Sequence, residues 1–212
     1  MSDGPRIPLR WAVAEADRLF KAWGEPTGWL VVGSVRRGVG TVGDLEVLLP
    51  AAPAAADPVY GRIAATVRRR VRGVPVLFGD DAPGATIVGE ELRGLVPGFL
   101  AASLSVWPQG GNESDRRVPV QVYRYTPRNL GWTLIMRTGP REFGMHFLLN
   151  WKRLYSIAAH RQASVDGHLV DRVGEVVTVA TEEEAFTMCG MRFVPPEQRD
   201  EYVMRHHQGA MQ

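Results

Sequence analysis

The chain has 212 residues, of which 45% are hydrophobic and 23% are charged. This length and composition are typical of one globular domain or a compact pair of small lobes, and they exclude a chain that is disordered over most of its length. The formal net charge of +2 excludes a histone-like polycation, and the single Cys189 excludes both a disulfide framework and a cysteine-based zinc site.

No apolar run approaches the roughly 18 residues that span a bilayer, and the N-terminus carries no signal-peptide pattern. We therefore expect a cytoplasmic protein without a membrane partner. Among the basic residues only Lys21 and Lys152 are lysines. Arginine suits phosphate ligands, although a biased base composition of the gene produces the same pattern.

Hydrophobic spacing and turn residues predict helices and strands in mixed order. The predicted helices cover Leu9–Trp23, Tyr60–Val71, Phe143–Tyr155 and a segment after Thr181, which can cap it with Glu184 three residues on. The predicted strands cover Trp29–Val32, Leu45–Leu49, Val74–Phe78, Ala85–Val88, Leu104–Trp107, Val118–Tyr123, Trp132–Met136, Leu169–Val173 and Val176–Val179. This order predicts an α+β fold, with a boundary near Thr138-Gly139-Pro140 between a larger lobe and a smaller C-terminal one.

The segment with the most specific chemistry begins Gly33-Ser34-Val35-Arg36-Arg37-Gly38. A strand leads into a Gly-Ser turn whose amides and hydroxyl can hold phosphate oxygens, and Arg37 adds a positive charge suited to a triphosphate. Asp44 and Glu46 follow two residues apart, so that both side chains project from one face of the next strand. Two carboxylates beside a phosphate-binding turn predict a site for Mg²⁺ or Mn²⁺ that would support in-line phosphoryl transfer.

This segment resembles the nucleotidyltransferase-superfamily signature, and its Gly-Ser-x-Arg-Arg-Gly form resembles the palm of family X (beta-like) DNA polymerases. Further segments resemble the same family in the same order: Ile7-Pro8-Leu9-Arg10, Thr138-Gly139-Pro140-Arg141-Glu142-Phe143, Thr181-Glu182-Glu183-Glu184-Ala185-Phe186, Gly190-Met191 and Val194-Pro195-Pro196-Glu197-Gln198-Arg199.

The resemblance covers roughly residues 5–50 and 116–202. It implies a palm over 5–138, with a mixed sheet flanked by helices, in which the loosely matched stretch 51–115 is a candidate insertion. A small thumb-like lobe would follow over 139–202, and then a polar tail over 203–212. This minimal set of modules is similar to that of members carried by bacterial viruses (phages).

The resemblance also implies three groups of contacting residues. The metal ions would be held by Asp44 and Glu46. The triphosphate would be contacted by Gly33, Ser34, Arg37 and Gly43. The sugar and the base would be faced by Thr138, Gly139 and Phe143. Family members often have a cis peptide after this glycine, and Pro140 makes a cis bond accessible here.

The third metal-binding carboxylate of the family is replaced by Gln121, counting back with the usual spacing. In the family this carboxylate is a catalytic residue, because it ligates the ion that polarises the attacking 3′-hydroxyl. Glutamine supplies no negative charge and accepts no proton, so this ion would be held weakly. Glu113 and Asp115 are nearby candidates for a substitute ligand.

A basic cluster lies at the end of the predicted helix 60–71: Arg68, Arg69, Arg70 and Arg72. These arginines would either contact a nucleic-acid backbone, where charge supplies affinity without sequence readout, or form a solvated basic face.

Three functions fit these observations. The first is a family-X-like nucleotidyltransferase that adds nucleoside monophosphates to a nucleic-acid 3′-hydroxyl, with DNA as the expected acceptor and release of pyrophosphate. The second is a catalytically impaired relative that binds DNA, a nucleotide or a protein partner. It is favoured by Gln121, by Met136 and Arg137 in place of the aromatic pair that usually checks the sugar, and by Gly144 in place of the base-contacting asparagine. The third is the same palm transferring nucleotides to RNA or to a protein side chain.

Overall fold

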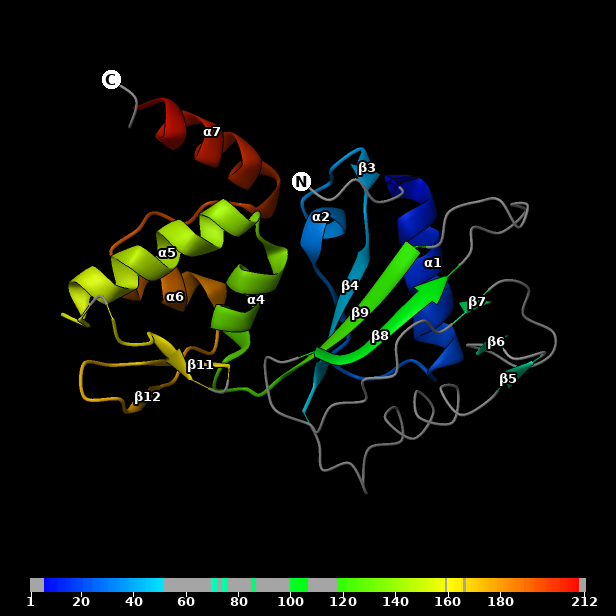
Figure 1. Ribbon diagram of the computed structural model, residues 1–212, viewed down its shortest axis with the longest axis horizontal. Coiled ribbons are helices and arrows are strands. Elements are labelled where there is room, and N and C mark those ends of the chain that lie inside the picture. Colours follow the sequence, from blue (N-terminus) through cyan, green and yellow to red (C-terminus); the bar gives the residue numbers. More distant parts are fainter. Residues whose placement is uncertain are drawn as a thin grey trace.

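The computed structural model describes residues 6–51, 118–158, 160–165 and 167–209, and between 51 and 118 the backbone of four strands. Helices and small sheets are mixed along the chain, which confirms the predicted α+β class. Figure 1 shows a sheet with α1 in one half, and α5, α6 and α7 with β11 and β12 in the other. Within these residues, every helix is too short or too polar to cross a bilayer.

A mixed five-stranded sheet in the order β2-β4-β9-β8-β7 forms the N-terminal half. Its strands are β2 (Leu30–Val31), β4 (Leu45–Pro50), β7 (Ala85–Thr86), β8 (Leu100–Val106) and β9 (Val118–Tyr125). The neighbours β4 and β9 are parallel, whereas the other pairs are antiparallel. Two further antiparallel ladders join β1 (Ile7–Pro8) to β3 (Thr41–Val42) and β5 (Arg70–Val71) to β6 (Val74–Pro75).

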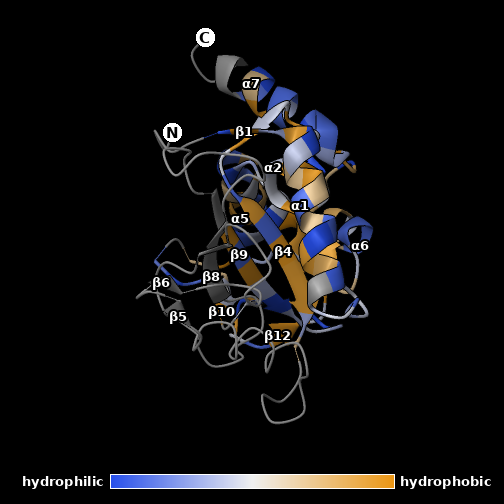
Figure 2. Cartoon of the chain, turned by 90° about the vertical axis from the view of Figure 1, so that its right-hand side faces the viewer, coloured by the Kyte–Doolittle hydropathy of each residue, from blue (hydrophilic) through white to orange (hydrophobic). Residues whose placement is uncertain are grey.

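Helix α1 (Leu9–Ala22) packs on one face of this sheet. The buried residues shared by the helix and the strands are Ala12, Ala16, Leu19, Leu45, Val47, Leu49, Val120 and Val122. Figure 2 shows β4 largely in the hydrophobic colour and β9 with hydrophobic and hydrophilic segments, while α1 carries both hydrophilic and hydrophobic residues, as expected for a helix with one buried side.

The opposite sheet face is covered from α4 (Leu130–Thr138), whose Leu130 and Leu134 pack against Leu48 and the neighbouring strand residues. Side chains alternate between the faces of a strand. Glu46 and Gln121 therefore project from this second face, away from α1, and the Glu46 carboxylate lies close enough to Arg137 of α4 to interact with its charge.

The C-terminal half has its own aromatic core, which includes Phe143, Phe147, Trp151, Leu169 and Phe186. Its elements after α4 are α5 (Arg141–Leu154), β10 (Ser164–Val165), β11 (His168–Val170), β12 (Val176–Val177), α6 (Glu182–Met188), the 3-10 turn η2 (Pro196–Gln198) and α7 (Arg199–Gly209). The predicted helices Leu9–Trp23 and Phe143–Tyr155 are confirmed within a few residues. The predicted cap is confirmed too, because Thr181 Oγ1 accepts from the Glu184 amide at 3.1 Å.

The predicted strand over Trp132–Met136 is wrong, because this segment is helix α4. A short apolar run does not distinguish a strand from a buried helix. The spacing of the apolar residues shows that a helix forms here. Trp132 and Ile135, three residues apart, enter the C-terminal core. Leu130 and Leu134, four residues apart, face the sheet. Helix α4 thus contributes to the cores of both halves and lies before the predicted boundary at 138–140.

Two other predictions need correction. Residues 203–209 of the predicted polar tail belong to α7, where Tyr202 and Val203 pack against the C-terminal core. The predicted helix over 60–71 is wrong at its end, since Arg70–Val71 form β5, and the rest of it lies outside the described residues. The Gly139–Pro140 peptide bond is cis.

Candidate metal and nucleotide site

The Gly33–Ser34 turn lies directly against the Glu46 carboxylate. Antiparallel pairing of β2 with β4 brings them together, and the Val32 amide donates to the Glu46 carbonyl oxygen at 2.9 Å. Gly33 has a φ of +66°, and a Cβ there would meet Glu46 Oε2 at 2.2 Å. Only glycine fits this position. The chain then continues as the single-turn helix α2 (Gly33–Arg36).

Asp44 and Glu46 form a partly buried pair of like charges. The pKa of Glu46 is raised from 4.5 to about 7, first by burial and then by the Asp44 charge, whereas Arg137 and Arg37 act in the opposite direction. Burial also raises the pKa of Asp44 above its ordinary value, opposed by Arg37 and Arg6. Holding the two carboxylates together in their charged forms therefore costs the folded state free energy, and a bound cation would relieve their repulsion.

Gln121, which the resemblance puts at the position of the third carboxylate, lies beside Glu46. The two residues are register partners in the parallel pair of β4 and β9, and neighbouring strands are about 4.8 Å apart. The Gln121 Oε1 atom accepts a hydrogen bond from the Tyr123 hydroxyl. Burial raises the pKa of Tyr123 to about 12, so this hydroxyl remains a donor at neutral pH. The amide oxygen that could have faced a metal is therefore already engaged.

The residues present fit a divalent cation held by oxygen atoms. Asp44 and Glu46 supply the carboxylates, and Mg²⁺ typically takes one or two of these while keeping several waters. Ser34 Oγ is buried and has no hydrogen-bond partner among the described residues, so the turn holds an unsatisfied hydroxyl that a ligand would satisfy. Over the same ranges, no group of three or more His, Cys, Asp or Glu side chains gathers.

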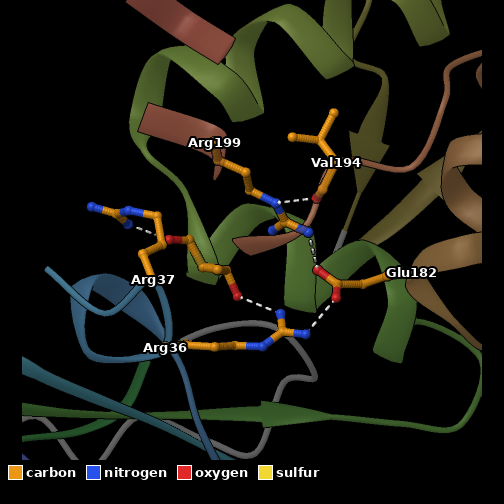
Figure 3. A network of polar contacts seen from close by, with 6 residues as sticks. Arg36, Arg37, Glu182, Val194 and Arg199 are labelled. Carbon is orange, nitrogen blue, oxygen red and sulfur yellow. Dashed lines mark hydrogen bonds and ion pairs between the residues drawn. The ribbon is translucent and has the colours of Figure 1, made fainter. Parts of the chain in front are cut away.

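Arg36 joins α2 to the C-terminal half (Figure 3). Its Nη1 donates to Thr138 Oγ1 at 2.8 Å and its Nη2 to Glu182 Oε2 at 2.5 Å. Arg199 Nη2 donates to the other Glu182 oxygen at 2.9 Å, and Arg199 Nε to the Val194 carbonyl at 3.1 Å. Glu182 thus receives one arginine from each half.

Arg37, which was expected to hold the triphosphate, is also engaged by the C-terminal half. Its Nε donates to Asp200 Oδ2 at 2.8 Å, and its Nη1 donates to the Thr138 carbonyl oxygen. Arg37 still acts on the charges of both Asp44 and Glu46. It therefore lies between the carboxylates and α7, and a phosphate would have to compete with Asp200 for it.

The residues expected to face the sugar and the base are inside the protein. Thr138 is fully buried and is used by Arg36 and Arg37. Gly139 is buried beside it, with Arg37 Nη1 3.2 Å from the position of a Cβ. Phe143 is fully buried, with its ring 5.4 Å from that of Tyr202. Their contact with a nucleotide, as implied by the resemblance, stays a prediction.

The remaining predicted residues divide into two groups. A Cβ at Gly43 would meet nothing within 4 Å, so this position leaves open space beside Asp44. Arg68, Arg69, Arg72, Glu113 and Asp115 lie outside the described residues, and Arg70 is placed only by its backbone in β5.

The sequence interpretation missed Tyr123, Glu182 and Asp200. Tyr123 could have been found, because it lies two residues after Gln121 on an alternating strand and so shares its face. Glu182 and Asp200 are 146 and 163 residues from their partners Arg36 and Arg37. No local pattern indicates pairing over such separations.

The fold and the site together define an α+β protein with a paired-carboxylate site on one face of a mixed sheet. Comparison with protein-family models gives no match, and comparison with curated proteins gives none either.

Proposed function

We propose that this protein is a palm-type nucleotidyltransferase that binds a divalent cation and a nucleoside triphosphate. It would transfer a nucleoside monophosphate to a nucleic-acid 3′-hydroxyl and release pyrophosphate. One observation carries the proposal: Glu46 Oε2 lies against Gly33, where a Cβ would be 2.2 Å away. The Gly33–Ser34 turn and the carboxylates thus lie together, which supports a joint site for phosphate and metal.

Each residue has a role in this proposal. Asp44 and Glu46 would hold Mg²⁺ or Mn²⁺, which when bound supplies positive charge to the phosphate oxygens. The Ser34 hydroxyl and the Gly33–Ser34 amides would hold the triphosphate. The acceptor oxygen would bond to the α-phosphorus as the bond to the bridging oxygen of pyrophosphate breaks. Gln121 accepts no proton, so the hydroxyl proton would pass to water, which favours slow transfer.

A second candidate is a relative that binds the cation and a nucleoside triphosphate without turnover. It is favoured by Gln121, whose Oε1 is engaged by Tyr123, and by the burial of Thr138 and Phe143. Both candidates require the same cation and triphosphate site, so they differ only in whether transfer follows binding.

Primer extension with each labelled dNTP and NTP, first with Mg²⁺ and then with Mn²⁺, separates the candidates when DNA, RNA and protein acceptors are compared. Metal-dependent triphosphate binding is measured in parallel. Asp44→Asn is expected to abolish both incorporation and metal-dependent binding, because it removes a metal ligand. Asp17→Asn, at an exposed site paired with Lys21 on α1, is the matched control and should change neither.

Incorporation onto RNA or protein alone would reassign the acceptor. Binding that needs Asp44 but leads to no incorporation with either metal favours the second candidate. A folded protein that binds no triphosphate with either metal would contradict both.

Asp200→Asn is expected to raise the affinity for Mg²⁺–triphosphate by roughly threefold to tenfold. Asp200 Oδ2 accepts a hydrogen bond from Arg37 at 2.8 Å, and a phosphate that binds Arg37 must displace this carboxylate. Removing the Asp200 charge should therefore make the free energy of phosphate binding more favourable by about 1 kcal/mol. A titration with a labelled triphosphate measures the change. Glu201→Gln is the control, because it removes the same charge and because Glu201 pairs, among the described residues, only with the exposed Arg205 of its own helix. An affinity that is unchanged or reduced in Asp200→Asn would mean that Arg37 does not bind phosphate.

A further inference from the structure

The candidate site also contains a positively charged side chain, Arg137, to which the proposed function gives no role. Arg137 lies in the last turn of α4, and its Cζ is 3.8 Å from the centre of the Tyr123 ring. Tyr123 in turn donates to Gln121 Oε1, and Gln121 is the register partner of Glu46. Arg137, Tyr123, Gln121 and Glu46 therefore form a continuous row from α4 across the sheet face.

The charges along this row differ from one end to the other. The Asp44 and Glu46 end is anionic and has the unsatisfied Ser34 hydroxyl nearby. The Gln121 end carries a neutral amide whose oxygen is already engaged, and the guanidinium of Arg137 lies beyond it, close enough to act on the charge of Glu46. A second divalent cation placed near Gln121 would find no further carboxylate beside the Asp44 and Glu46 pair among the described residues, and it would be repelled by Arg137.

We propose that this site holds a single divalent cation, on Asp44 and Glu46, and that the Arg137 guanidinium supplies the positive charge that a second ion would bring beside Gln121. This inference rests on the proposed function and specifies its cation requirement. Arg137 is suited to the role because its charge is permanent and because stacking on the Tyr123 ring fixes its position. The neutral amide of Gln121 and the guanidinium of Arg137 would then act together, because the first supplies no ligand charge for a second ion and the second supplies positive charge in its place.

The number of bound ions tests the inference. Mn²⁺ is titrated into the full chain with a non-hydrolysable nucleoside triphosphate, and bound ions are counted by electron paramagnetic resonance. We expect one ion for the wild type and one for Arg137→Lys, which keeps the charge. Gln121→Asp alone should also bind one, because the new carboxylate would pair with Arg137. Gln121→Asp combined with Arg137→Met should bind two.

Each deviation has a distinct meaning. Two ions in the wild type would overturn the inference and leave the proposed function standing, and Glu113→Gln and Asp115→Asn would then identify the additional ligand. One ion in the double variant, with its first site intact, would overturn the role of Arg137. A wild type that binds no ion would overturn the proposed function itself. The wild-type count requires no substitution, so the test does not depend on whether a variant folds.

Discussion

Glu182→Gln is expected to lower the free energy of unfolding by about 3–5 kcal/mol, the usual cost of removing one partner from a buried ion pair. The Glu182 side chain is 3% exposed and that of Arg199 is 0% exposed. Glutamine keeps the volume but leaves the Arg199 guanidinium buried without a counter-charge. It also removes the anion that Arg36 reaches from α2, so contact between the two halves weakens.

Urea unfolding of Glu182→Gln beside Glu183→Gln measures this effect. Glu183 is exposed in the same first turn of α6, so the control removes the same charge from the same end of the helix. We expect the control to lie within about 0.5 kcal/mol of the wild type, as is usual for surface substitutions. Similar losses in the two variants would contradict a specific role of the buried network.

The difference in unfolding free energy between the wild type and Glu182→Gln should depend on pH. Burial raises the pKa of Glu182, but hydrogen bonds and charge from Arg36 and Arg199 outweigh it and hold the pKa below its ordinary 4.5. The stabilisation is therefore fully present above pH 4.5 and is lost as pH falls through the lowered pKa of the folded state. The difference between wild type and Glu182→Gln should shrink on acidification below this pH.

Glu46→Gln is expected to stabilise the protein at pH 8 by roughly 2–3 kcal/mol, and this effect should develop as pH rises from 4.5 to about 7. The folded-state pKa of Glu46 is raised from 4.5 to about 7, so the folded protein holds a proton that the unfolded chain has lost between these values. Wild-type stability should fall as pH rises from 4.5 towards 7 and then level off. Below 4.5 both states are protonated and the variant should match the wild type.

Denaturant unfolding at pH 4.5 and pH 8, with and without Mg²⁺, measures this effect. Mg²⁺ should recover stability in the wild type at pH 8, because it binds the folded carboxylates, and should recover less in Glu46→Gln. Glu197→Gln, at an exposed glutamate of η2, is the control and should follow the wild type at both pH values. A wild-type stability that does not change over this range would contradict the burial of an ionised Glu46.

Local pattern was sufficient for much of the fold. The apolar spacing of α1 and α5, the Thr181 cap and the alternation along β9 follow from one stretch of chain each. The same is true of the shared face of Asp44 and Glu46, because side-chain direction along a strand has a period of two. The spacing of the family that the chain resembles put Gln121 at the position of the third carboxylate, and the parallel register brings Gln121 beside Glu46.

The sequence by itself determined the α+β class, the Gly33–Ser34 turn and the candidate carboxylates, since each depends on neighbouring residues. Only the tertiary structure decided that 132–136 is helical, because the two cores on either side of α4 select between strand and helix. The tertiary structure alone also decided that Thr138 and Phe143 are buried. It likewise decided that Arg37 donates to Asp200 and that Arg137 stacks on the Tyr123 ring. These contacts join residues from different elements, and their energies depend on burial and charge that exist only once the chain has folded.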